Sequence, residues 1–189
     1  TAAERFAAGV VQPLPDSVEL DSREVALGRE LYNDVRLSKD DTLSCASCHG
    51  LDEGGCDQER VATGVDGQKG PINAPTVLNS GFQFKQFWDG RAASLEDQSK
   101  GPPVNPIEMG MSDLEAALQR LRAIPGYQPY FEEAFGPGDT ITIDNAAKAV
   151  AAYERTLITP NDPLDQYLRG DEDAISPLAA KGIEVLLIT

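Results

Sequence analysis

Apolar side chains recur at helical spacing in separate parts of the chain, and helix start and stop signals flank them. The first predicted helix covers about residues 22–32, and Asp21 can cap it. A second begins at a capping box made by Ser112 and Glu115, and the Pro125-Gly126 pair ends it. The apolar stripes are Val25, Gly28, Leu31 and Tyr32 in the first helix, and Leu114, Ala117, Leu118, Leu121 and Ile124 in the second.

Two more predicted helices follow. Asp144 starts one of them, and Ser176-Pro177 starts the other, which continues to the end of the sequence. Alternation typical of a strand occurs at residues 140–143, a stretch too short to predict a strand. The apolar faces are Ala147, Val150, Ala151, Leu157 and Ile158 in the first of these helices, and Ile183, Val185, Leu186 and Leu187 in the second.

The segment between Gly50 and Gly110 follows neither a helical nor a strand period. It is dense in Gly, Pro, Asn and Asp. Irregular segments of that length in a compact domain are usually functional, and this one has the pattern of a loop wrapped around a large cofactor. The predicted fold class is therefore mainly α with long ordered loops.

Composition narrows the classes of partner. The chain has 189 residues, enough for one domain with a sizeable core, and its formal net charge is −15 at pH 7. Nucleic acid is excluded as a partner because its phosphates would repel this charge, whereas a cationic protein would be attracted to it. No apolar run approaches the length of about 18 residues that a membrane span requires, so no span is predicted.

Candidate chemistry is concentrated in the stretch SCASCHG, which holds Cys45, Cys48 and His49, the only histidine of the chain. A zinc site would need four ligands, and only Cys56 and carboxylates could complete one. A thioredoxin-like dithiol would need an alternating strand–helix context, which the pattern lacks. Cys-x-x-Cys-His is the attachment pattern of c-type haem, and we favour that interpretation over zinc or a redox dithiol.

The spacing suits haem for a chemical reason. Two cysteines on one helical turn reach both vinyl groups on one side of the porphyrin, and the next residue, His49, then lies beneath the iron as its proximal ligand. Covalent haem attachment takes place outside the bacterial cytoplasm, so we expect a periplasmic protein. Met109 and Met111, the only methionines, could ligate the iron from the other side, but nothing in the sequence indicates that they do.

Beyond the cysteine motif, the chain resembles the bacterial di-haem cytochrome c peroxidases. The resemblance rests on four stretches, which include CASCHG, NAPTVLN, FWDGRA and AAYERTLITPNDPLDQYLRGD and cover most of residues 27–171. It implies a cytochrome c-like haem domain, the amino-terminal one of two, that reduces hydrogen peroxide to water. It also implies electrons from a small cytochrome c or a cupredoxin, a calcium ion between the haem domains and a tendency to form homodimers.

The resemblance assigns roles to particular residues. Cys45 and Cys48 hold the haem and His49 ligates its iron. Gln98 and Glu108 match the polar residues of the peroxide pocket, where a carboxylate can move a proton between the two peroxide oxygens and an amide can stabilise charge on the leaving one. Trp88 matches a tryptophan between the two haems, and Asn73 a residue of the calcium site. Plainer roles are a solvated carboxylate for Glu108, a surface residue for Gln98, a core residue for Trp88 and a turn former for Asn73.

Two departures from the family bear on function. Val65 stands where many members have a histidine that ligates the peroxidatic iron at rest, so we expect this haem to be open to peroxide even when fully oxidised. A second Cys-x-x-Cys-His is absent. We therefore expect residues 1–160 to form the peroxidatic domain and residues 161–189 a linker and the first helix of a second haem domain whose remainder is absent from this chain. A separate second chain and a single-haem protein are the alternatives, and Cys56 receives no catalytic role.

The favoured function is thus a cytochrome c peroxidase, with one haem c in this chain and a second in the full-length protein. One alternative is a MauG-like di-haem oxidase that acts on a protein side chain, which the valine at position 65 favours. The other is a non-enzymatic electron-transfer or sensing cytochrome. The pair Gln98 and Glu108 distinguishes these classes, because an electron carrier has no need of it.

Overall fold

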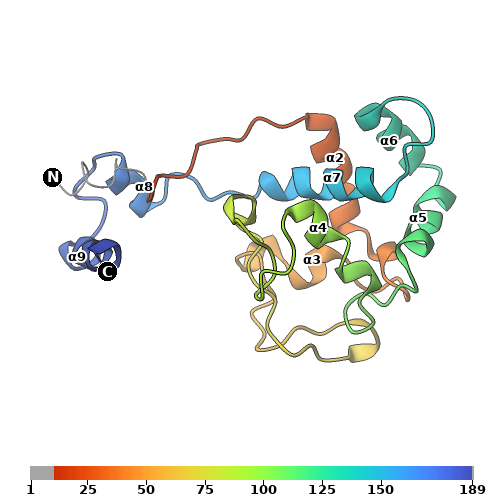
Figure 1. The fold of residues 1–189 in the computed structure, drawn as a ribbon, viewed down its shortest axis with the longest axis horizontal. Helices are drawn as coiled ribbons and strands as arrows, with labels where there is room; N and C mark the ends of the chain where they lie inside the picture. Colours follow the sequence, from red (N-terminus) through yellow and green to blue (C-terminus); the bar gives the residue numbers. More distant parts are fainter. Residues whose placement is uncertain (1–10, 189) are drawn as a thin grey trace. The chain divides into compact units, whose positions relative to one another are not determined.

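The computed structural model describes residues 11–188, and within them regular structure is helical, with no strand (Figure 1). Two isolated bridges, Thr63 with Lys69 and Gln86 with Ala92, are its only β-type pairings there. The predicted mainly α class is confirmed. The α-helices are α2 (Ser22–Asn33), α3 (Cys45–Cys48), α4 (Leu95–Ser99), α5 (Leu114–Ala123), α6 (Tyr127–Phe135), α7 (Ile143–Arg155), α8 (Pro163–Leu168) and α9 (Pro177–Ile188).

The predicted start signals are right for α2 and for α9, which begins at Pro177, and they are shifted for α5 and α7. The carboxylate of Asp21 accepts a hydrogen bond of 2.9 Å from the amide of Arg23, as expected of an N-cap. The predicted capping box at Ser112 is wrong: Asp113 caps α5 by accepting from the amide of Ala116 at 2.8 Å. The helix predicted to start at Asp144 is α7. It begins one residue earlier, at Ile143, and Thr142 caps it.

Helix ends and short helices account for the other differences. Because α7 ends at Arg155, the predicted face residues Leu157 and Ile158 lie beyond it. The Pro125-Gly126 pair separates α5 from α6, which the sequence pattern did not predict. The irregular segment from Gly50 to Gly110 is confirmed, although it contains α4 and four short 3-10 turns: η2 (Leu51–Glu53), η3 (Val65–Gly67), η4 (Ser80–Phe82) and η5 (Pro102–Val104).

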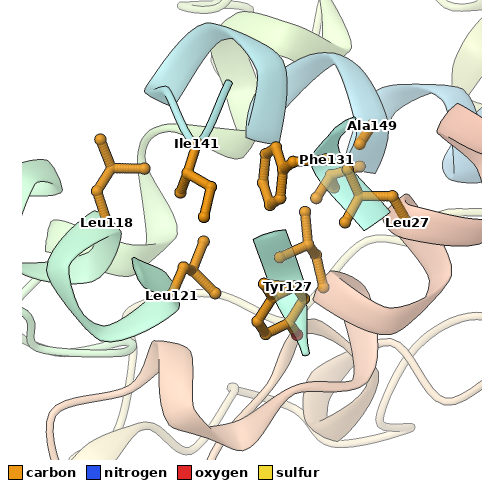
Figure 2. Close-up of a cluster of buried hydrophobic side chains, with 9 residues drawn as sticks. Leu27, Leu118, Leu121, Tyr127, Phe131, Ile141 and Ala149 are labelled. Carbon is orange, nitrogen blue, oxygen red and sulfur yellow. The ribbon is translucent and has the colours of Figure 1, made fainter. Parts of the chain in front are cut away.

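The hydrophobic core lies where α2, α5, α6 and α7 meet (Figure 2). Phe131 of α6 is fully buried at its centre, and the rings of Tyr127 and Phe131 pack edge to face with centroids 6.3 Å apart. This core supports one side of α7, and α4 packs against another. The labelled core residues in Figure 2 are Leu27, Leu118, Leu121, Tyr127, Phe131, Ile141 and Ala149.

A buried polar contact joins the end of α2 to α6. Asp34, 8% exposed, accepts a hydrogen bond of 2.6 Å from the hydroxyl of Tyr127 and also pairs with Arg36. Burial raises the pKa of Asp34, but the hydrogen bonds from Arg36 and Tyr127 outweigh this effect, so its pKa lies below the ordinary value. The carboxylate is therefore charged at neutral pH, and the tyrosine bond is charge-assisted.

We expect Tyr127→Phe to lower the free energy of unfolding by about 1.5–3 kcal/mol, the range for a hydrogen bond to a charged group. Tyr130→Phe, at a 43% exposed position of the same helix, is the matched control and should change it little. Urea unfolding of both variants measures the difference. Equal stabilities would show that the contact between Tyr127 and Asp34 contributes nothing to the fold.

By its internal contacts the chain divides into two units. One comprises Glu19–Leu157, and the other combines the segment up to Val18 with the segment from Ile158 onward. In the second unit the carboxylate of Asp165, 4% exposed, accepts from the amides of Leu14 at 2.8 Å and Asn161 at 2.9 Å. The predicted candidate site residues all lie in the first unit, and the assignment of the later residues to a second haem domain stays a prediction.

Candidate functional site

A cavity of about 670 Å³ with a mostly apolar wall lies in the Glu19–Leu157 unit. Its wall is formed by α3, α4, α7 and the irregular segment between residues 50 and 110. The segment that the sequence predicts to wrap around a large cofactor therefore does line a cavity. All the residues singled out for catalysis or for binding line this one cavity: Cys45, Cys48, His49, Asn73, Trp88, Gln98 and Glu108.

The two cysteines of the motif occupy one helical turn, α3, as their spacing predicts. Ser44 precedes the turn, and its amide donates to the hydroxyl of Ser47 at 3.0 Å, which fixes the start of the helix. Burial raises the pKa of the Cys45 thiol to about 12, and it also raises the pKa of the Cys48 thiol. Neither thiol is therefore ionised at neutral pH. A reactive redox dithiol needs a cysteine with a lowered pKa, so these surroundings do not suit one.

His49 is held at the end of this turn by main-chain contacts, which include the backbone of Pro75. Its Nδ1 lies 3.3 Å from the carbonyl oxygen of Gly55, and its own carbonyl accepts from the hydroxyl of Tyr32 at 2.9 Å. Burial lowers the pKa of the imidazole, so the ring is neutral at pH 7. A neutral ring that donates from Nδ1 leaves the lone pair of Nε2 for a metal ion.

Glu108 is half-buried on a loop whose shape other segments fix. Asn105 donates to its Oε1 at 2.7 Å, and the amide of Val65 donates to its carbonyl oxygen at 2.9 Å. Gly64 is required here, because a Cβ at that position would overlap the carbonyl oxygen of Ile107. Burial raises the pKa of Glu108, while the charge of Arg91 and the bond from Asn105 oppose the rise.

Gln98 approaches the same cavity from α4, the short helix that Ser94 caps by accepting from the amide of Asp97. It is half-buried in the cavity wall, and its role in the peroxide pocket stays a prediction. A neutral amide and a carboxyl group whose pKa is raised thus line one largely apolar space. Such a pair can supply a hydrogen bond and accept or return a proton to a small molecule between them.

Trp88 and Asn73 lie together at the cavity, since the indole Nε1 of Trp88 donates to the carbonyl oxygen of Asn73 at 3.3 Å. Trp88 is 63% exposed, so it is not a core residue. Within residues 11–188 no three or more His, Cys, Asp or Glu side chains gather as a metal-binding group. A calcium ion bound by Asn73 stays a prediction.

The remaining sequence candidates have distinct surroundings. Val65 is 1% exposed and packs against Gly110, so its side chain belongs to the packed interior beside the Glu108 loop. Met109 and Met111 are both buried, and Met109 lines the cavity. Cys56 also lines it, and the thiol of Cys56 lies 3.6 Å from the carbonyl oxygen of Glu53.

Sequence analysis missed several polar residues of the cavity wall, among them Glu154, Arg91 and Ser80. Glu154 follows Tyr153 in an otherwise apolar helix face, and a single acid there gives no periodic signal. Arg91 lies within FWDGRA, where the resemblance drew attention to the tryptophan; its guanidinium is 3.5 Å from the ring centroid of Phe87. Ser80 is 5% exposed, and its Oγ has no hydrogen-bond partner among the described residues.

Comparison with known proteins identifies the family. The chain is 47% identical over 175 residues to cytochrome c peroxidase Ccp of Escherichia coli, a match over 93% of this chain and 37% of that protein. It is 41% identical to the cytochrome c551 peroxidase of Pseudomonas aeruginosa, over 96% of this chain and 54% of the relative. A family model for di-haem cytochrome c peroxidase matches residues 22–173. The chain belongs to the di-haem cytochrome c peroxidase family.

The fold agrees with this membership. A crystal structure of a MauG-like protein associated with microbial copper homeostasis superposes with a TM-score of 0.75 at 32% identity, over 89% of this chain and 50% of that one. The cytochrome c-like haem domain predicted from the sequence is therefore confirmed. The chain spans 37% and 54% of the lengths of the two peroxidases that it matches.

Haem c is the cofactor that membership of the di-haem cytochrome c peroxidase family implies, and the cavity fits it. The volume lies in the range of about 300–1,000 Å³ that is usual for cofactor sites. Two thiols on one turn and an imidazole with a free Nε2 form the donor set for covalent attachment and iron ligation. The unpartnered hydroxyl of Ser80 is a buried polar group that a bound molecule could satisfy.

Proposed function

We propose that this chain is the peroxide-reducing part of a cytochrome c peroxidase. It would reduce hydrogen peroxide to water with electrons from a small cytochrome c or a cupredoxin. One observation carries the proposal: Gln98 and Glu108 line the same cavity as the Cys45, Cys48 and His49 group. An acid–base residue and a hydrogen-bonding amide beside a haem site suit peroxide chemistry and are superfluous in an electron carrier.

The residues singled out from the sequence each have a part in this proposal. Cys45 and Cys48 bind the haem through thioether bonds, and His49 ligates its iron through Nε2. When bound, the haem supplies the electrons and a Lewis-acidic iron. Glu108, ionised, takes a proton from one peroxide oxygen and returns it to the other, which leaves as water. Gln98 donates a hydrogen bond to the leaving oxygen and stabilises the charge that develops there.

The exposed side of the cavity serves electron delivery in this proposal. Trp88, 63% exposed, relays electrons from a second haem domain that belongs to the full-length protein. The hydrogen bond from Trp88 to the carbonyl of Asn73 orients the indole, and Asn73 contributes to a calcium site shared with that domain. We further propose a periplasmic location and a homodimer; the described residues contain no helix long and apolar enough to cross a membrane.

Steady-state oxidation of a reduced small cytochrome c by hydrogen peroxide tests the proposal. The haem-loaded chain of 189 residues is used, and it starts fully oxidised. Because Val65 cannot ligate iron, we expect turnover at once, without a lag or prior reduction. The full-length protein is assayed in parallel. No turnover by either, with haem intact, contradicts a peroxidase; turnover only by the full-length protein assigns electron delivery to its other domain.

An oxidase acting on a protein side chain is a second candidate. The likeness to the MauG-like structure and the valine at position 65 favour it, although the identity is lower, 32% against 47%. Peroxide turnover with a small cytochrome c as the sole reductant would favour the peroxidase. Consumption of peroxide only when a protein substrate is added would favour the oxidase.

A further inference from the structure

One buried carboxyl group in the cavity wall has no part in the chemistry proposed above. Glu154 lies in the last turn of α7, lines the cavity and is 6% exposed. Its backbone carbonyl caps the helix end, but its carboxyl group makes no hydrogen bond or ion pair within the described part of the chain. Buried carboxylates are normally paired, so an unpaired one beside a cofactor cavity needs an explanation.

Neighbouring charged groups do not neutralise Glu154. Arg155 follows it in sequence, but Glu96 of α4 engages that guanidinium with both carboxylate oxygens, at 2.7 Å and 3.1 Å. Glu96 is itself a like charge that disfavours ionisation of Glu154. Two titratable groups on neighbouring helices, Tyr32 of α2 and Cys45 of α3, interact electrostatically with Glu154. Both are uncharged at neutral pH. A negative charge on Glu154 would thus stand uncompensated.

The balance of these effects sets how readily Glu154 binds a proton. Burial raises its pKa to about 7, with Glu96 adding to the rise and Arg155 opposing it. The pKa of Glu154 therefore lies in the neutral range, where the group can bind or release a proton. In an apolar wall, a change of charge elsewhere in the cavity is poorly screened and acts strongly on such a group.

We propose that Glu154 is the residue that binds a proton when the haem in this cavity is reduced. The inference rests on the haem site proposed above. In the step, an external reductant gives up one electron, the iron passes from ferric to ferrous, and the carboxylate of Glu154 binds one proton from water. One O–H bond forms on the carboxyl group and one breaks in a hydronium ion of the solvent, and the added proton offsets the added negative charge.

Such a residue would matter for peroxide reduction because every electron delivered to peroxide must be matched by a proton. Glu108 moves a proton between the two oxygens but adds none overall. Glu154 would take up a proton at the reduction step and hold it in the wall of the cavity that Glu108 and Gln98 also line. Glu154 would respond to the charge of the haem and would not touch peroxide itself. We therefore do not call it a catalytic residue.

The test is a spectroelectrochemical titration of the haem-loaded chain at several pH values around 7. Reduction that binds a proton makes the midpoint potential fall as pH rises, because the reduced form holds more protons. We expect this fall in the wild type, and a flatter dependence in Glu154→Gln over about one pH unit on either side of 7. Glu154→Asp should restore part of the slope, and Glu133→Gln, an exposed carboxyl in α6, should leave it unchanged.

Infrared difference spectra between the two redox states give a second readout. We expect a protonated carboxyl band that appears on reduction and is missing in Glu154→Gln. Equal slopes and unchanged bands in wild type and Glu154→Gln, with haem content and thermal stability retained, would overturn the inference while leaving the haem site intact. A chain that takes up no haem at all would overturn the proposed function together with it.

Discussion

Replacing Glu108 with glutamine should reduce peroxide turnover by about 10²–10⁴-fold, the range for loss of a general acid–base residue. Glutamine keeps the size of the side chain and its contact with Asn105, but it cannot accept the peroxide proton. The general base must be ionised, so wild-type turnover should rise with pH through the pKa of Glu108, which burial places above the ordinary value. Steady-state rates across pH measure both effects.

The control for Glu108→Gln is haem content, measured by the absorption of the reduced protein, which should not change. Glu59→Gln removes an exposed carboxyl from the irregular segment between residues 50 and 110 and should leave both turnover and its pH dependence as in the wild type. Full turnover in Glu108→Gln would show that another group moves the proton. Glu154 would then be the next carboxyl to replace, since it lines the same cavity.

Gly28→Ala should lower the free energy of unfolding by about 1–3 kcal/mol, the range for overpacking a buried contact. A Cβ at this position would overlap the carbonyl oxygen of Ala149, so α2 and α7 approach too closely for any side chain. The usual effect of this substitution inside a helix has the opposite sign, a gain of about 0.5–1 kcal/mol. Urea unfolding therefore distinguishes the two effects by the sign of the change in the free energy of unfolding.

Gly126→Ala is the matched control for Gly28→Ala, because nothing lies within 4 Å of a Cβ built there and its φ of −68° suits any residue. We expect its stability to equal or exceed that of the wild type. If Gly28→Ala proved as stable as Gly126→Ala, the contact between α2 and α7 would have to be looser than the structure indicates. The variant should also lose part of its haem if α7 moves, because Glu154 and Val150 of that helix line the cavity.

Much of the fold could be predicted because the longer helices have amphipathic patterns and capping residues. The predicted start of α2 is confirmed, because the carboxylate of Asp21 accepts a hydrogen bond from the amide of Arg23. Capping failed at α5, where Ser112 and Asp113 are both good caps and only the backbone geometry chooses between them. The sequence pattern missed α6 because the Pro125-Gly126 pair, a stop signal, stands directly before a new helix.

The candidate site was predicted less evenly. Cys45, Cys48 and His49 are adjacent in sequence, so their spacing alone brings them together. Gln98 and Glu108 needed the family resemblance, since nothing local marks them, and the structure places them at one cavity. Glu154 escaped both approaches, because its burial and its lack of a partner arise only when α4 and α2 pack around α7.

The hydrogen bond from His49 to the carbonyl oxygen of Gly55 has a consequence for how this haem centre can be tuned. A carboxylate in that place would draw the proton from Nδ1 and make the ring a stronger electron donor to iron, whereas a peptide carbonyl leaves it a neutral imidazole. Because the acceptor is main chain, no side-chain replacement can delete it. The donor strength of the ring therefore depends on the main-chain conformation of the Gly50–Gly55 turn and of the segment at Pro75, and loop-length changes would alter it more than point substitutions.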